Sequence, residues 1–180
     1  MNEQIWWYVA RSSGIVALVL LVLSVVWGVL LATRALKPHD RPAWLLDLHK
    51  WLGGTALIMT GFHMLGLYLD GYIGYEFTEL FVPGASEYRP LAVTIGVLSF
   101  YVMVAVQATS YLRRWLSRPM WHAVHVLSYG LVWGAALHAG LAGTDTVNRA
   151  YQVLALVLAM VAVTASVVRI LSPGKHRAIP

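Results

Sequence analysis

Four histidines stand on two long apolar stretches of the sequence, at spacings that favour metal chemistry. His49 and His63 are fourteen positions apart in the stretch 46–70, and His125 and His138 are thirteen apart in a later one. In an α-helix, at about 1.5 Å and about 100° per residue, fourteen residues cover roughly 21 Å and return to nearly the same face. One membrane-spanning helix would therefore carry one imidazole near each surface. An ionisable side chain at membrane depth indicates a function.

The composition places the chain among integral membrane proteins. It has 180 residues, of which 59% are hydrophobic and 12% charged, and its mean hydropathy is +0.67. Such values lie outside the range of soluble domains. The absence of cysteine excludes disulfides, iron–sulfur clusters, covalently attached c-type haem and thiol chemistry.

Five apolar runs predict an all-α integral membrane protein, a five-helix transmembrane bundle that forms one domain over residues 1–180. Each run is long enough to cross a bilayer, for which about 20 residues suffice. Proline near the start of several runs and Thr146 before the last one predict helix starts. The tail after Leu171 is too short for a flavin- or nicotinamide-binding fold, so we expect no soluble dehydrogenase domain. The predicted helices are 7–33, 44–69, 91–112, 120–142 and 147–171.

Basic residues predict the orientation. Ten of the thirteen lie on one side of the predicted bundle, in the first and third connections and near the C-terminus. By the positive-inside rule the N-terminus is outside and the C-terminus is cytoplasmic. The net charge of +5 therefore fits membrane orientation better than nucleic-acid binding. The long second connection, 70–89, is acidic and aromatic, and we expect an outer cap with a short helix near Phe77–Val82, or else a solvated loop on the headgroups. Five tryptophans near helix ends are interpreted as interfacial anchors: Trp6, Trp7, Trp44, Trp115 and Trp121.

The second and fourth predicted helices run in the same direction, which pairs the histidines by depth. His49 and His125 lie near the inner surface, and His63 and His138 near the outer one. Two stacked bis-imidazole pairs suit two haem irons that transfer electrons. Thirteen residues leave His138 about 140° from the face of His125 on an ideal helix. We therefore expect a π-bulge or kink in the fourth helix, within 128–134.

Other interpretations of the histidines stay open at this point. Histidines in membrane helices also form interhelical hydrogen bonds, or serve metal or proton pathways. No carboxylate accompanies these four at membrane depth. His122 is expected at the interface, and His39 and His176 in solvent. Small residues between the first two ligands leave room for a flat group: Gly53, Ala56 and Thr60.

Three spacings together resemble the transmembrane domain of the ferric reductase/NADPH oxidase superfamily, especially its small bacterial members. They are His-x13-His (His49, His63), Trp-x3-His (Trp121, His125) and His-x12-His (His125, His138). The resemblance covers about 44–142, and the flanking helices by position only. It implies two b-type haems, the inner held by His49 and His125 and the outer by His63 and His138. Larger members have six helices and a dehydrogenase domain, whereas five helices are expected here.

The resemblance also implies partners. Electrons would pass from the cytoplasmic side to an unspecified acceptor at the outer face, as in the membrane haem component of an oxidoreductase. The donor would be a separate flavoprotein, a flavin at the cytoplasmic face on this chain or a partner, or a quinol. A multi-pass protein of a bacterial plasma membrane, with no nucleic-acid partner, is expected.

Basic residues near the predicted haems are candidate partners for the haem propionates, although each also fits the positive-inside pattern. Arg89 is the outer candidate, and the inner candidates are Lys50, Arg41, Arg114 and Arg118. A ligating imidazole usually donates its second N–H to an acceptor. The expected acceptors are carbonyls one turn earlier, or the hydroxyls of Thr60 and Ser128.

Three rival functions remain. A cytochrome b561-like quinol-linked module would keep the haems and change the donor. A haem-free metal or proton transporter, or a structural subunit of a larger complex, would use the histidines differently.

Overall fold

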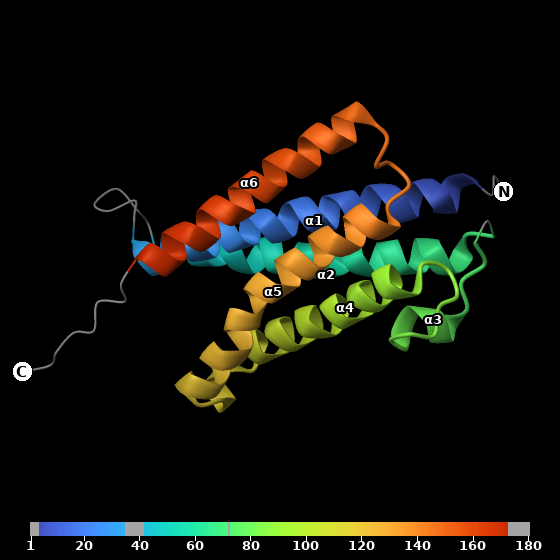
Figure 1. Cartoon of the computed structure of the whole chain (residues 1–180). Helices are drawn as coiled ribbons and strands as arrows, with labels where there is room; N and C mark the ends of the chain where they lie inside the picture. Colours follow the sequence, from blue (N-terminus) through green and yellow to red (C-terminus); the bar gives the residue numbers. More distant parts are fainter. Residues whose placement is uncertain (1–3, 35–41, 72, 173–180) are drawn as a thin grey trace, which may run out of the picture.

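The computed structural model describes residues 4–34, 42–71 and 73–172, and within these ranges it is helical (Figure 1). Its five long helices are each long and apolar enough to cross a membrane, which confirms the predicted spans. The predicted short helix of the second connection is present as α3, and a 3-10 helix, η1, precedes α5. The elements are α1 (Gln4–Thr33), α2 (Pro42–Leu69), α3 (Phe77–Phe81), α4 (Pro90–Tyr111), η1 (Arg113–Trp115), α5 (Arg118–Ala142) and α6 (Arg149–Leu171).

Local chemistry explains where the helices begin. Proline occupies the first turn of both α4 and α5, where a missing N–H costs no intrahelical bond. The Asn148 side chain caps α6 by accepting from the N–H groups of Ala150 and Tyr151, at 2.8 and 3.4 Å. The expected cap at Thr146 was therefore wrong, because Asn148 competes for the same orphan donors two residues further on.

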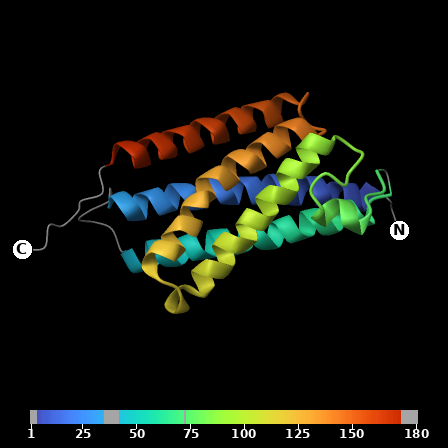
Figure 2. The ribbon, with the colours of Figure 1, turned by 60° about the horizontal axis from the view of Figure 1, so that its bottom comes forward.

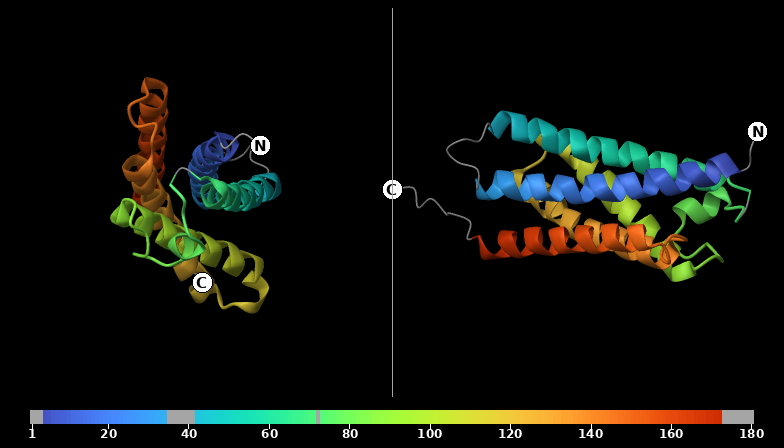
Figure 3. Two further views of the ribbon diagram at one scale, coloured as in Figure 1. Left: turned by 90° about the vertical axis from the view of Figure 1, so that its right-hand side faces the viewer. Right: turned by 90° about the horizontal axis from the view of Figure 1, so that it is seen from above.

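The long helices form two antiparallel pairs and one flanking helix. α1 and α2 lie side by side, and α4 and α5 form a second pair that crosses them. α6 packs along α1 (Figures 2 and 3). α2 and α5 run in the same direction, as predicted. Gly66 permits the close approach of α1 and α2, because a Cβ at this position would lie 2.7 Å from the backbone nitrogen of Ala10.

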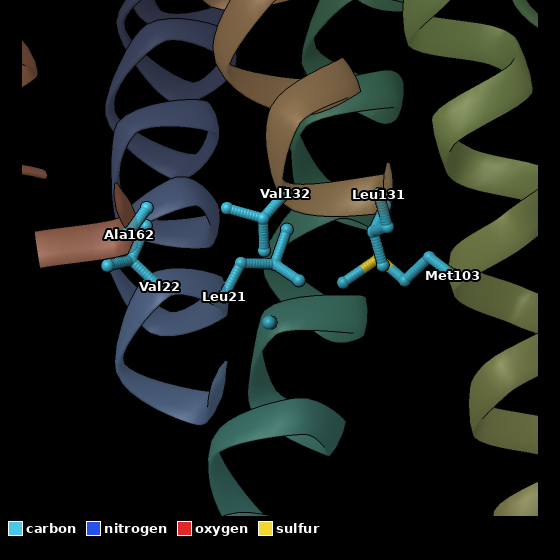
Figure 4. Packing of buried hydrophobic residues seen from close by; sticks show 7 residues of the cluster. Leu21, Val22, Met103, Leu131, Val132 and Ala162 are labelled. Atoms are coloured by element: carbon cyan, nitrogen blue, oxygen red, sulfur yellow. The ribbon is translucent and has the colours of Figure 1, made fainter. Parts of the chain in front are cut away.

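A buried apolar cluster lies half-way along the bundle and draws on all five long helices (Figure 4). Ala56 of α2 is completely buried in it, seven residues from His49 and seven from His63. The cluster therefore places buried apolar side chains in the interior between the two histidine depths. Its members are Leu21, Val22, Ala56, Met103, Leu131, Val132 and Ala162.

The second connection folds into a cap on one end of the bundle. Tyr75 and Leu80 are buried there against Val93 and Val97 of α4. A capping box forms at the N-terminus of α3. The backbone N–H of Glu76 donates to the Glu79 carboxylate at 2.8 Å, and this hydrogen bond holds the pKa of the Glu79 carboxyl below its usual value. Burial raises the pKa of Tyr75 to about 12. Of the two interpretations of this connection, the folded cap is the one that the structure contains.

Candidate functional site

The four histidines meet in two pairs between α2 and α5. The ring centroids of His49 and His125 lie 5.9 Å apart, and those of His63 and His138 lie 6.2 Å apart, with interplanar angles of 70° and 80°. A first-row metal lies about 2 Å from a ligating imidazole nitrogen, and the ring centre lies about 1 Å beyond that nitrogen. Two imidazoles on opposite sides of one metal are thus about 6 Å apart between centroids. Both pairs could hold a metal with two axial imidazoles.

The pair formed by His63 and His138, called the outer pair because the sequence predicts that it lies near the outer surface, is fixed by hydrogen bonds to neighbouring helices. His63 Nδ1–H donates to the Ala10 carbonyl of α1 at 2.7 Å, and His138 Nδ1–H donates to the Ala92 carbonyl of α4 at 2.8 Å. A carbonyl can only accept, so the proton is on Nδ1 and the lone pair of Nε2 is free.

Glycine makes these hydrogen bonds sterically possible. Four residues after each accepting carbonyl stands a glycine, Gly14 on α1 and Gly96 on α4. An added Cβ would lie 2.9 Å from Nδ1 of His63 at the first position, and 2.6 Å from Nδ1 of His138 at the second. The ring thus occupies the space of the missing side chain. We call a carbonyl with a glycine four residues later a carbonyl–glycine notch.

His49 lies in a third carbonyl–glycine notch, again on α1. Its Nδ1–H donates to the Ser24 carbonyl at 2.9 Å, and a Cβ on Gly28 would lie 3.3 Å from its Cε1. The two notches of α1 are fourteen residues apart, as are the two histidines of α2 that they receive. Sequence reasoning had placed the acceptors on the histidines' own helices. The available signal was the Gly14–Gly28 spacing, which equals the His49–His63 spacing.

His125 is held differently. Its Nδ1 is buried and has no hydrogen-bond partner among the residues that the structure describes. The Trp121 ring stacks on it instead, with centroids 4.9 Å apart and planes 24° apart, and the Arg113 guanidinium lies 4.5 Å from the centre of that indole. Sequence reasoning had interpreted Trp121 as a membrane anchor. Its contact gives it a second role, to orient the His125 ring.

α4 has no carbonyl–glycine notch for His125. The carbonyl accepting from His138 belongs to Ala92, and the residues thirteen and fourteen positions later, at the depth of His125, are Ala105 and Val106. Four residues after these stand Thr109 and Ser110, whose hydroxyls donate to the same two carbonyls at 2.7 Å. These carbonyls are therefore covered by side chains and already accept an additional hydrogen bond.

Of the two features expected in α5, a π-bulge or a kink, the π-bulge was wrong, because this helix is α-helical from Arg118 to Ala142. α5 instead crosses α2 obliquely and its axis changes direction along its length (Figure 1). A helix that passes from one side of its neighbour to the other presents opposite flanks to it at its two ends. Histidines on different faces of α5 can thus both meet α2.

The outer pair borders a cavity of about 230 Å³. Its wall is mostly apolar and includes small residues of α1, α4 and α5, and the cap contributes Tyr75 and Tyr88. Arg11 and Asp145 also line it. Arg11 Nε donates to Asp145 Oδ2 at 2.7 Å, a second contact joins Nη2 and Oδ1, and the guanidinium lies 3.8 Å from the centre of the Trp7 ring. Sequence reasoning had assigned Arg11 to the outer side without giving it a role.

The predicted propionate partners have varied positions. Arg89, in a left-handed conformation with φ 43° before α4, donates to the Leu141 carbonyl and so joins the ends of α4 and α5. Lys50 pairs with Asp47 at 3.3 Å on an exposed face. Arg118 begins α5 and is exposed. Arg114 lies over Trp115, with 4.8 Å from the guanidinium to the ring centre.

Other residues that were singled out have ordinary structural roles or lie elsewhere. Arg41, His39 and His176 lie outside the described residues. The hydroxyl of Thr60 donates to the Ala56 carbonyl at 2.9 Å, and not to a histidine. Gly53 faces the amide of Gln107, which an added Cβ would approach to 3.2 Å, so α4 fills the space beside it.

Comparison with known proteins decides the family. Residues 13–136, more than half of the chain, match the family described as ferric reductase like transmembrane component. The chain belongs to this family. Membership of the ferric reductase-like components implies a multi-pass membrane protein that transfers electrons across the bilayer. The matched segment begins in α1, so this helix belongs to the family region, and it ends two residues before His138. No curated protein and no solved structure matches the chain.

Proposed function

We propose that this ferric reductase-like protein is a di-haem b electron-transfer protein that carries electrons from the cytoplasmic side to an acceptor at the outer face. The observation that carries the proposal is the pair of facing imidazole pairs, at 5.9 and 6.2 Å between centroids, on two helices of the same direction. His49 and His125 would hold the inner haem, and His63 and His138 the outer one. The haems, when bound, supply one-electron carriers whose potentials the axial ligands and surroundings tune.

The chain's own residues prepare the ligand atoms. At three of the four positions the Nδ1–H hydrogen bond selects the tautomer with a free Nε2, restricts ring rotation and raises the basicity of the ligand. The pairs are about 21 Å apart along α2, since fourteen residues rise about 1.5 Å each. The buried cluster around Ala56 and Met103 keeps water out of the space between them.

The proposed direction of transfer rests on charge. Six basic residues among those described stand at the end of the bundle opposite the cap, which the positive-inside rule makes cytoplasmic. The N-terminus would then be outside and the C-terminus cytoplasmic, in a bacterial plasma membrane. The donor would be a separate flavoprotein, a flavin bound at the cytoplasmic face, or a quinol. The six are Arg34, Lys50, Arg113, Arg114, Arg118 and Arg169.

The propionate partners are proposed in two groups. At the outer haem we add Arg11, which lines the cavity beside His63, to the predicted Arg89. At the inner haem Lys50 and Arg118 remain the predicted partners. Guanidinium and ammonium groups bind carboxylates by charge-assisted hydrogen bonds.

The geometry counts against the rival functions. In a cytochrome b561-like module the histidines come from four helices, whereas here they come from two. A proton pathway needs groups that exchange protons, but the three hydrogen-bonded rings donate to backbone carbonyls, which cannot. Among the described residues no cluster of three or more histidine, cysteine or acidic side chains could hold a metal ion.

A haem count tests the proposal. Purified protein should show a reduced-minus-oxidised spectrum of b-type haem and a pyridine haemochrome count of two per chain. His63→Ala and His138→Ala should remove the same haem, and His49→Ala and His125→Ala the other. Gly61→Ala is the matched control in α2, because an added Cβ there meets nothing within 4 Å. Protein that is colourless after expression with ample haem would contradict the proposal and favour a transporter.

A further inference from the structure

The histidine without a carbonyl–glycine notch points to a function of its own. We infer that His125 is the exchangeable ligand of the four, so that a small neutral ligand reaches the inner haem iron by displacing it, whereas the outer iron stays closed. This inference rests on the proposed function, because it needs both haems in place. It goes beyond that function by assigning a ligand-binding position to one of them.

The hydrogen bond to a ligating imidazole is a substantial part of its affinity. Removing such a partner typically weakens metal binding by about 10–100-fold, because the ligand loses both orientation and basicity. His49, His63 and His138 each keep this bond, at 2.7 to 2.9 Å. His125 has no such bond to any residue that the structure describes. The same iron is therefore held by one strong and one weak ligand, His49 and His125.

The neighbours of His125 do not replace the missing acceptor. Trp121 stacks on the ring and orients its plane, but an indole offers a donor N–H and no acceptor atom. Trp121 Nε1 is itself buried without a partner among the described residues. The Arg113 guanidinium, 4.5 Å from the centre of this indole, is itself a donor and offers no acceptor either.

At the outer iron both proposed ligands are held more firmly than His125 is at the inner iron. His63 and His138 each lie against a glycine where an added Cβ would come within 3.0 Å of the ring, so each imidazole is enclosed by the helix that accepts its proton. A ring so enclosed cannot swing away without breaking its hydrogen bond. For a ligand to exchange at the outer iron, one imidazole would have to lose its bond to the metal. It would also have to leave its carbonyl–glycine notch and lose the hydrogen bond there.

The proposed exchange is balanced. In the ferrous protein the bond from iron to His125 Nε2 breaks, and a bond from iron to the carbon of carbon monoxide forms. The imidazole leaves as a neutral group, and no electron or proton is transferred.

Carbon monoxide is the probe. The full-length protein, with two haems per chain by pyridine haemochrome, is reduced with dithionite and saturated with the gas, and the Soret change is measured. We expect half of the haem to form the carbonyl complex. Conversion of none of the haem, or of all of it, would overturn the inference while leaving the di-haem proposal standing. A haem count below two would instead contradict the proposed function.

Two double variants identify the reactive iron. His63→Ala/His138→Ala removes both ligands of the outer haem, so that only the inner haem remains, and all of it should bind carbon monoxide. His49→Ala/His125→Ala removes both ligands of the inner haem, so that only the outer haem remains, and none of it should bind carbon monoxide. The reverse result would overturn the inference.

A single variant keeps the test decisive if the double variants do not fold. Trp121→Leu removes the stacking partner of His125 and should accelerate carbon monoxide binding, whereas Trp115→Leu, at an exposed tryptophan of η1, should not. An unchanged rate in Trp121→Leu would count against His125 as the departing ligand.

Discussion

The outer and inner histidine pairs come from the same two helices, yet the protein surrounds them differently. At the outer end both rings lie in carbonyl–glycine notches, beside a cavity with an ion pair at its edge and under a folded cap. At the inner end one ring lies in such a notch, and the other is held by a stacked tryptophan. The side chain is histidine at all four positions. The contrast teaches that α1 and α4, which contribute none of the four histidines, determine which of the rings is fixed by a hydrogen bond to a neighbouring helix.

The largest expected effect comes from filling a notch at the outer end. Gly96→Ala places a Cβ 2.6 Å from Nδ1 of His138, so the ring must move and its hydrogen bond to Ala92 must break. We expect loss of most of the outer haem with the inner haem retained, read as a haemochrome count falling from two toward one. Gly130→Ala, where a Cβ meets nothing, is the control in α5. Equal loss of both haems would mean that the outer and inner ends are not independent.

Filling the inner notch should have a smaller effect. A Cβ on Gly28 would lie 3.3 Å from the His49 ring, so a shift of a few tenths of an ångström accommodates it. We expect Gly28→Ala to keep both haems and to weaken the inner one, measured as faster haem transfer to apomyoglobin. Gly14→Ala, with its closer approach of 2.9 Å to His63, should weaken the outer haem more strongly. The opposite order would show that space at the notch is not the controlling factor.

The ion pair at the outer cavity should tune one haem only. Arg11→Leu removes a positive charge near the outer iron and should lower the midpoint potential of the outer haem by tens of millivolts, while Asp145→Asn leaves Arg11 uncompensated and should raise it. A redox titration followed by absorbance measures both shifts. Arg149→Leu, at the start of α6, is the matched control. Shifts of the same sign in both variants would contradict an electrostatic origin.

The stacked tryptophan should matter less than a notch. A stacked aromatic pair contributes about 0.5–1.5 kcal/mol, which corresponds to at most roughly tenfold in affinity. Trp121→Leu should therefore weaken the inner haem by up to about tenfold and leave the outer haem unchanged, as measured by the same transfer assay. An effect as large as that of Gly96→Ala would mean that stacking holds a ligand as firmly as a notch does.

The smallest expected effect concerns the cap, which covers the outer end and has no counterpart in the described part of the inner end. The Glu79 carboxylate accepts from Glu76 N–H, and its lowered pKa means that folding favours the charged form. The resulting stability is present above the unfolded pKa and decreases as the pH falls through the folded pKa. Glu79→Gln should remove this pH dependence and slightly increase proteolysis within 76–89, with Glu87→Gln as the control. Equal cleavage of both variants would show that the capping box does not hold the cap.

Features that depend on neighbours in the sequence could be predicted. The five spans followed from apolar runs, and the starts of α4 and α5 from Pro90 and Pro119, because both depend on local chemistry. The start of α6 could not be read as surely, since Thr146 and Asn148 are both good caps and only the folded chain selects one. The π-bulge was wrong because the angle between His125 and His138 around the helix axis was interpreted as if α5 ran parallel to α2. In the structure α5 crosses α2 obliquely.

By itself the sequence determined which side chains can bind a metal, their depth, and their pairing, because the rise and direction of each helix convert spacing into position. The tertiary structure decided the rest. The register and crossing of helices far apart in the chain decide which carbonyl accepts from His63 and that Arg11 meets Asp145. They also leave His125 without an acceptor within the described part of the chain. Such contacts depend on how close two backbones come, and a single missing Cβ, as at Gly96, decides that distance.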